Sequence, residues 1–136
     1  MKKYVIDSSI ILSVGIEKNP KTTVLYSDLI RKIEKKKVKL YAPVLLKYEV
    51  ANGLRFSALS KEELYKFWDC FSDAPIIYFD VDKSFFSTVA RLAKKMDTTL
   101  YDTIFHYIAM VIDGTFLTRD KKYYQKARIL GNIELI

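Results

Sequence analysis

The chain has 136 residues, of which 50% are hydrophobic and 14% aromatic, so it can bury a sizeable core and is not expected to be disordered as a whole. Its single cysteine, Cys70, excludes an internal disulfide and a cysteine-based zinc site, and it fits a reducing cytosol. No segment reaches the roughly 18 apolar residues of a membrane span, and the apolar stretch after Met1 is too short for a signal peptide, so we expect a cytoplasmic protein without membrane association.

The net charge is +7, and all of the excess lies in residues 1–68, which hold 14 Lys/Arg and 7 Asp/Glu, whereas residues 69–136 hold 9 of each. The densest basic run is 31–39. It either attracts nucleic acid or is only a solvated helix end, where lysines complement the helix dipole.

The first half of the chain predicts two strands and four helices. Residues 4–6 read as a short buried strand, and Asn19-Pro20 breaks the helical stretches 9–14 and 22–36. A brief strand at 39–42 leads to Pro43, which suits the first turn of a helix reaching about Ala58. Ser60 and Glu63 form a capping box that opens a helix to about Phe71.

Strands and helices also alternate in the second half of the chain. Residues 76–79 are an apolar strand, Asp82 caps a helix to about Lys95, and a further helix over 99–112 is stopped by Asp113-Gly114. A strand at 115–117, a helix at 121–130 and a strand at 133–135 complete the pattern. No linker or repeat interrupts it, so residues 1–136 are expected to form one domain.

This alternation predicts an α/β fold with three layers, in which helices cover both faces of a short parallel sheet of about five strands. In such sheets, ligand sites form outside the carboxyl ends of the strands, near the point where the strand order reverses. Catalytic or ligand-binding residues are therefore expected at that edge.

Three acids are expected there. Asp7 directly follows the first strand, Asp120 follows the 115–117 strand, and Asp102 opens the 99–112 helix. Each also has a simpler explanation: Asp7 and Asp120 could serve only as helix N-caps, and Asp102 could complete a capping box with Thr99.

A fourth acid, Glu49, has no basic neighbour on its own helix. The side chains one or two turns away are Leu45, Leu46, Asn52, Gly53 and Phe56. A carboxylate on such a face is costly unless it is paired, so its partner is either a lysine from elsewhere or a metal ion.

Bringing these acids together requires a cation, because two like charges about 4 Å apart repel by about 4 kcal/mol at an effective dielectric of 20. Carboxylate and water ligands suit Mg²⁺ or Mn²⁺. The scarcity of histidine and cysteine argues against zinc.

Four segments carry a resemblance to a known family. They are YVIDSS at 4–9, YEVANGL at 48–54, LYDT at 100–103 and LTRDKK at 117–122. In this order and at these intervals they resemble the PIN-domain nucleases, and among these the VapC-type toxins of toxin–antitoxin pairs. The resemblance covers nearly the whole chain.

The resemblance implies a PIN-like sheet and a metal-dependent ribonuclease. It implies metal ligands at Asp7, Glu49, Asp102 and Asp120, with Ser9 and Thr118 as supporting polar residues. It also implies a small antitoxin partner, RNA as substrate and a homodimer. One departure is His106, which could bond Asp102 one turn earlier or point into a polar gap.

In the expected chemistry, a metal-activated water attacks phosphorus and leaves a 5′-phosphate and a 3′-hydroxyl. Because the 2′-hydroxyl is not used, only the resemblance favours RNA over DNA. The basic first half would hold the phosphate backbone, with Lys47 and Arg55 as contacts on the Glu49 helix.

Three alternatives differ in class. A response-regulator phosphotransfer domain lacks the adjacent acids it needs beside Asp7 and an acidic pair to support Asp80. A haloacid-dehalogenase-like phosphatase needs an acid where Ser9 stands. A catalytically inactive PIN-like domain that binds RNA or protein stays open, and a cleavage assay separates it from a nuclease.

Overall fold

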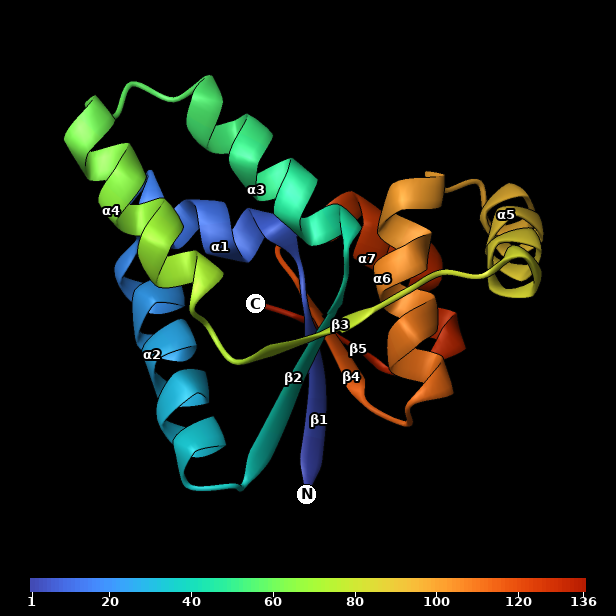
Figure 1. Cartoon of the computed structure of the whole chain (residues 1–136). Helices are drawn as coiled ribbons and strands as arrows, with labels where there is room; N and C mark the ends of the chain where they lie inside the picture. The colour runs from blue at the N-terminus through green and yellow to red at the C-terminus, as the bar shows by residue number, and fades with distance from the viewer.

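Five strands form one parallel sheet in the order β3-β2-β1-β4-β5 in the computed structural model, which describes residues 1–136 (Figure 1). The strands are β1 (Lys2–Ile6), β2 (Val38–Pro43), β3 (Ile76–Phe79), β4 (Thr115–Thr118) and β5 (Ile133–Leu135). The helices are α1 (Ser8–Gly15), α2 (Pro20–Glu34), α3 (Leu45–Arg55), α4 (Lys61–Ser72), α5 (Lys83–Met96), α6 (Leu100–Val111), α7 (Lys121–Ala127) and the 3-10 helix η1 (Arg128–Leu130).

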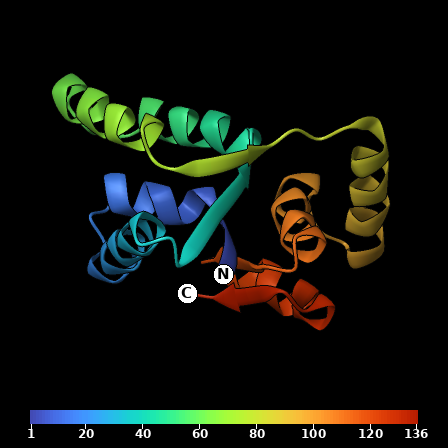
Figure 2. The ribbon, with the colours of Figure 1, turned by 60° about the horizontal axis from the view of Figure 1, so that its bottom comes forward.

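The helices cover both faces of this sheet. Helices α1 to α4 lie on one side and α5 to α7 on the other, as two views agree (Figures 1 and 2). This division of the helices follows from right-handed crossovers. The chain moves outward from β1 through β2 to β3 and then returns to β4, on the other side of β1, so the later helices lie on the opposite face. The predicted three-layer α/β/α fold with a short parallel sheet is confirmed.

The strand order reverses between β1, the central strand, and its neighbour β4. Ile6 is paired with Leu117, and the backbone N–H of Asp7 donates to the Leu117 carbonyl at 3.2 Å. The next residues on both strands, Asp7 and Thr118, therefore leave the sheet side by side at its carboxyl edge.

The buried core holds this edge in place. Val5, Ile6, Leu40 and Phe116 on the central strands are at most 1% exposed. On the face that α6 covers, Phe105 of α6 stacks on Phe116 of β4 with ring centroids 6.0 Å apart. Because α6 packs against this apolar centre, its N-terminus is fixed near the carboxyl ends of β1 and β4.

Two predicted helix boundaries are wrong. Pro43 does not begin a helix: it is the last residue of β2 and pairs with Phe79, so α3 starts only at Leu45. The expected 121–130 helix ends at Ala127 and continues as the 3-10 turn η1. Proline fits the end of a strand because its fixed φ is also compatible with extended backbone.

Other predicted helix ends are confirmed, although the stop after α6 works differently from expectation. Ser60 accepts from the backbone N–H of Glu63, and Asp82 accepts from that of Phe85. After α6 the left-handed residue is Asp113, with φ of 53°, rather than the glycine. Gly114 is needed for space, since a Cβ there would lie 2.7 Å from the Lys3 carbonyl oxygen.

The basic run 31–39 lies at the opposite edge of the sheet from the acids. It spans the end of α2 and the start of β2, beside the amino end of β1, where Lys2 pairs with Val38. Arg31 and Lys32 form salt bridges with Asp28. The run therefore includes the solvated end of α2 and lies away from the acids, and its attraction of nucleic acid stays a prediction.

No helix is both long enough and apolar enough to cross a membrane. Cys70 is exposed and unpaired.

Candidate functional site

Asp7 is the most deeply placed of the four predicted acids. Its side chain is 6% exposed and accepts hydrogen bonds from the hydroxyls of Thr118 at 2.8 Å, Ser9 at 3.1 Å and Ser8 at 3.4 Å. Although Asp7 stands at the N-cap position of α1, its side chain makes no capping hydrogen bond. The N-cap explanation alone therefore does not account for the contacts of this carboxylate.

Burial raises the pKa of Asp7 above its ordinary value of 3.8, and the hydroxyls of Thr118 and Ser9 only partly offset this. Desolvation disfavours the charged form, whereas each donated hydrogen bond favours it. Thr118 also accepts from the backbone N–H of Asp120 at 3.1 Å, so its hydroxyl joins the residues that follow β1 and β4. Ser9 and Thr118 thus lie beside Asp7 as expected.

Asp120 is exposed and does cap α7. Its Oδ1 accepts from the backbone N–H of Tyr123 at 2.9 Å, which confirms the N-cap explanation. Its second oxygen has no hydrogen bond within the chain. The charge of Asp120 still reaches the other acids, because it raises the pKa of Asp102.

Asp102 has two roles visible in the geometry. Thr99 accepts from the backbone N–H of Asp102 at 3.2 Å and donates its hydroxyl hydrogen to the Asp102 carboxylate at 2.8 Å, so the predicted Thr99 N-cap is present. The pKa of Asp102 is raised by burial and then by the charges of Asp7 and Asp120, while Thr99 lowers it. Thr99 therefore caps α6, and the Asp102 carboxylate holds the Thr99 hydroxyl while its charge repels neighbouring acids.

Glu49 is half-buried and has no basic partner, so the lysine explanation is wrong. Burial raises its pKa first, and the charges of Asp7 and Asp102 raise it further, against a lowering contribution from the Ser8 hydroxyl. Glu49 therefore faces the same region as Asp7 and Asp102.

The four acids share this region without forming a ready-made metal site. No group of three or more His, Cys, Asp or Glu side chains lies close enough together to hold one ion. None of the chain's salt bridges uses any of the four carboxylates. Their chemistry fits Mg²⁺, which takes oxygen ligands, keeps several of its waters and is commonly bound through only one or two carboxylates. The predicted tight four-acid cluster is, however, not preassembled.

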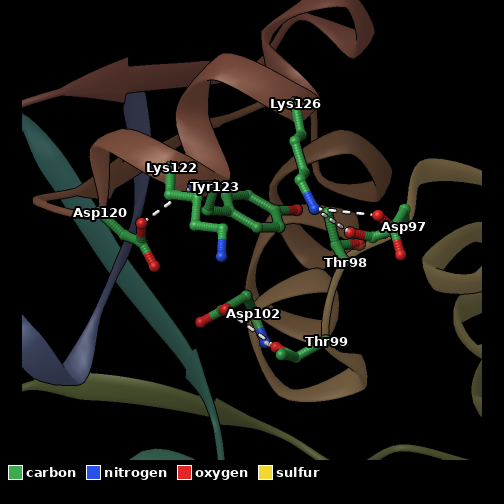
Figure 3. Close-up of a pocket in the computed structure, with 8 residues that line it drawn as sticks. All are labelled: Asp97, Thr98, Thr99, Asp102, Asp120, Lys122, Tyr123 and Lys126. Carbon is green, nitrogen blue, oxygen red and sulfur yellow. Dashed lines mark hydrogen bonds and ion pairs between the residues drawn. The ribbon is translucent and has the colours of Figure 1, made fainter.

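A small pocket of about 170 Å³ opens between α6 and α7 (Figure 3). Its lining residues are Asp97, Thr98, Thr99, Asp102, Asp120, Lys122, Tyr123 and Lys126. Lys126 is held by Asp97, through the backbone carbonyl at 2.7 Å and the carboxylate at 3.2 Å. Figure 3 shows the Lys122 ammonium directed into the space between Asp102 and Asp120, although it forms no salt bridge.

Sequence reasoning missed two residues of this region, Ser8 and Lys122. Ser8 could have been found, because a serine directly after Asp7 at the start of a helix stays close to that carboxylate. Lys122 gave no signal of its own, since a lysine in the first turn of an exposed helix usually points into solvent.

The two predicted RNA contacts, Lys47 and Arg55, are both exposed on α3. The Lys47 ammonium lies 4.2 Å from the ring centroid of Tyr78, and the Arg55 guanidinium lies 5.1 Å from that of Phe56. Neither cation is part of a salt bridge, so both charges stay available to a phosphate.

His106 does not bond Asp102, as one expectation had it, but is buried against the rings of Phe116 and Tyr123. It is 1% exposed, and burial lowers its pKa. Because a carbonyl oxygen only accepts, Nε2–H of His106 donates to Gly131 at 2.7 Å, and Nδ1 accepts from the Tyr123 hydroxyl at 2.9 Å. Both ring nitrogens are satisfied by distant parts of the chain.

Comparison with solved structures supports the same architecture. VapBC2 from Rickettsia felis, solved bound to a DNA fragment from their promoter, aligns with 14% identity and a TM-score of 0.67 over 98% of this chain and 97% of that chain. PAE2754 from Pyrobaculum aerophilum aligns with 20% identity and a TM-score of 0.62, over 92% of this chain and 84% of that chain. FitAcB from Neisseria gonorrhoeae aligns with 16% identity and a TM-score of 0.64, over 91% of this chain and 92% of that chain.

At these identities the solved structures establish the fold alone, and no curated protein sequence matches the chain significantly. The sequence itself matches the PIN domain family over residues 4–129, a span that contains all four acids. The chain therefore belongs to the PIN domain family.

Proposed function

We propose that the chain is a divalent-metal-dependent endoribonuclease, the toxin of a type II toxin–antitoxin pair. One observation carries the proposal: the buried Asp7 carboxylate lies at the switch point of the sheet, repels Glu49 and Asp102, and has no basic partner. Membership of the PIN domain family and the resemblance to VapC-type toxins support RNA as the substrate.

The proposed cofactor is Mg²⁺ or Mn²⁺. Asp7 and Asp102 would hold it, Glu49 would act as a ligand or orient a water molecule, and Asp120 would bind a second, weaker ion or support the first. When bound, the cation would neutralise the acids and make a water molecule easier to deprotonate.

The chain's own groups supply orientation, proton acceptance and phosphate contacts. The hydroxyls of Ser9 and Thr118 fix the direction of the Asp7 carboxylate. Because its pKa is raised, Glu49 is better suited to accept a proton from a water molecule at neutral pH. Lys122 is placed to contact a phosphate beside Asp102, and Lys47 and Arg55 are proposed as backbone contacts farther out.

We further propose that residues 1–136 act as one domain in the cytoplasm, paired with a small antitoxin and forming a homodimer. The likeness in fold to VapBC2 and FitAcB supports an antitoxin partner. A short neighbouring reading frame that encodes a DNA-binding protein would be the matching partner.

The test is cleavage of RNA by the purified chain with Mg²⁺, with Mn²⁺ and with EDTA. We expect cleavage only with metal, products that carry a 5′-phosphate, and loss of activity in Asp7→Asn. The matched control is Asp80→Asn, which changes an exposed acid that follows β3 outside the site. Equal cleavage by wild type and Asp7→Asn would indicate a contaminating nuclease and would refute the assignment.

One observation favours a second candidate. Because no three acidic side chains form a ready-made metal group, the chain could be a PIN-like domain that binds RNA or protein without cutting it. That candidate predicts that Mg²⁺ and Mn²⁺ leave the melting temperature unchanged, whereas a metal that binds only the folded state raises it.

A further inference from the structure

A second pocket lies on the other side of Glu49. It has a volume of about 450 Å³ and is lined by Leu45, Tyr48, Glu49, Asn52 and Tyr101. The two tyrosines come from the first turns of α3 and α6, which meet at the carboxyl edge of the sheet (Figure 1). Tyr48 is 70% exposed and Tyr101 is 59% exposed.

The position of each tyrosine follows from the acid beside it in sequence. Tyr48 directly precedes Glu49, and Tyr101 directly precedes Asp102. Successive side chains on a helix are about 100° apart, so when the acid faces the shared region the tyrosine lies on its rim. Two helices thus place an aromatic ring at the outer border of the same acidic region.

Neither ring is used by the fold. Tyr48 and Tyr101 pack against no other aromatic ring, and their hydroxyls make no hydrogen bond within the chain. Their exposure leaves apolar ring surface in water next to the candidate catalytic acids. That surface is free to stack on a ligand.

The chemistry of the pocket favours a nucleobase as that ligand. Bases stack on exposed aromatic side chains, and the Asn52 amide offers both a donor and an acceptor to a base edge. The unpaired cations Lys47 and Arg55 lie on the same helix and complement a phosphate backbone. A volume of about 450 Å³ falls in the range of small-ligand sites.

We propose that Tyr48 and Tyr101 form a nucleobase-stacking subsite that holds an unpaired base next to the phosphodiester bond placed at the acids. The inference rests on the proposed function for its substrate, RNA. A base inside a duplex is already stacked on both faces, so only an unpaired base can enter the subsite.

The test measures binding of a short, fluorescently labelled single-stranded RNA in EDTA, where cleavage is not expected. Tyr48→Ala and Tyr101→Ala should each weaken binding by about 5- to 100-fold, whereas Tyr48→Phe and Tyr101→Phe should bind like wild type, because stacking needs the ring and not the hydroxyl. The matched control is Tyr65→Ala, which removes an equally exposed tyrosine from α4, outside this pocket. The same RNA annealed into a duplex should compete poorly.

Unchanged RNA binding by the alanine variants would overturn the proposal. It would also be overturned if these variants kept RNA binding and lost binding only to a protein partner. Equal losses in the phenylalanine and alanine variants would also overturn it, since they would indicate hydroxyl bonding or misfolding. The subsite and the nuclease are separable: tyrosine-dependent binding without cleavage by any metal would retain the subsite and refute the nuclease. Cleavage with a wild-type KM in the alanine variants would retain the nuclease and refute the subsite.

Discussion

Replacing Asp7 with asparagine removes one buried charge and changes the shape of the side chain very little. The asparagine oxygen can accept the hydroxyl hydrogens of Thr118 and Ser9, which both bond one carboxylate oxygen of Asp7. Its NH₂ group would then face Ser8, whose hydroxyl can rotate to accept. The substitution therefore tests the electrostatics of Asp7 with its hydrogen-bond count preserved.

The expected effect without metal is stabilisation. Two charge-assisted hydrogen bonds become neutral ones, which costs about 1 kcal/mol each. Against this, the variant avoids the burial of an unpaired carboxylate, which costs several kcal/mol, and the repulsion from half-buried Glu49 and Asp102, about 1 kcal/mol each after solvent screening. The gains outweigh the loss, so the variant should be more stable at neutral pH by at least about 2 kcal/mol, or roughly 6–8 °C or more in Tm for a chain of this length.

The gain must depend on pH in a definite direction. Because the folded-state pKa of Asp7 is raised, the folded chain binds this proton more tightly than the unfolded chain. The wild type therefore gains stability as the pH falls through that raised pKa, and this gain is complete below the ordinary value of 3.8. The difference between Asp7→Asn and wild type should be largest at neutral pH and should vanish toward about pH 4.

Thermal unfolding followed by circular dichroism in EDTA, between pH 4 and pH 8, measures this difference. Asp80→Asn is again the control and should show no comparable pH-dependent gain. If Asp7→Asn is less stable than wild type by more than about 1 kcal/mol at neutral pH, or if the difference does not change with pH, the carboxylate is not electrostatically strained and the reasoning fails.

Three further predictions use the same contacts. Asp102→Asn in EDTA should be neutral or stabilising, because its amide oxygen can still accept from Thr99 while the charge is lost; clear destabilisation in a urea melt would mean that capping by the carboxylate dominates. Thr118→Val keeps the shape but removes the bonds to Asp7 and to the Asp120 N–H, so urea unfolding should show a loss of about 2 kcal/mol, and an unchanged midpoint would argue against that link. Lys122→Ala should leave stability unchanged, weaken RNA binding and reduce the slope of log affinity against log salt by about 1; an unchanged slope would place Lys122 outside the phosphate path.

Local patterns in the sequence were sufficient to predict the sheet and the approach of the acids. The strands are short apolar runs, and an acid directly after β1 must lie at the carboxyl edge whatever the rest of the chain does. The face of Glu49 was also predictable from helical spacing, since Leu45 and Asn52, one turn away on either side, line the same pocket. These features depend only on residues close together in sequence.

Features that depend on distant contacts were not predictable. The partners of His106 are Tyr123 and Gly131, whereas the sequence suggested a bond to Asp102, because only neighbours on the same helix are visible in a pattern. The place of the basic run 31–39 at the amino edge, away from the acids, also depends on the topology. Whether the acids lie within reach of one cation is a matter of a few ångströms, which spacing in sequence does not determine.

Capping and metal binding at this edge are compatible rather than competing explanations. Asp120 gives one oxygen to the N-terminus of α7, Asp102 lies in the first turn of α6, and Asp7 stands at the start of α1. Three helix N-termini thus direct partial positive charge at the acids, each favourable by a few tenths of a kcal/mol to about 1 kcal/mol. This support lowers the cost of placing Asp7, Asp102 and Asp120 at one edge of the sheet, and the need for a cation to hold all four acids together stays a prediction. It follows that EDTA should lower the Tm by a few degrees and abolish cleavage without unfolding the chain, because the cation adds binding energy to a site that the helices already stabilise.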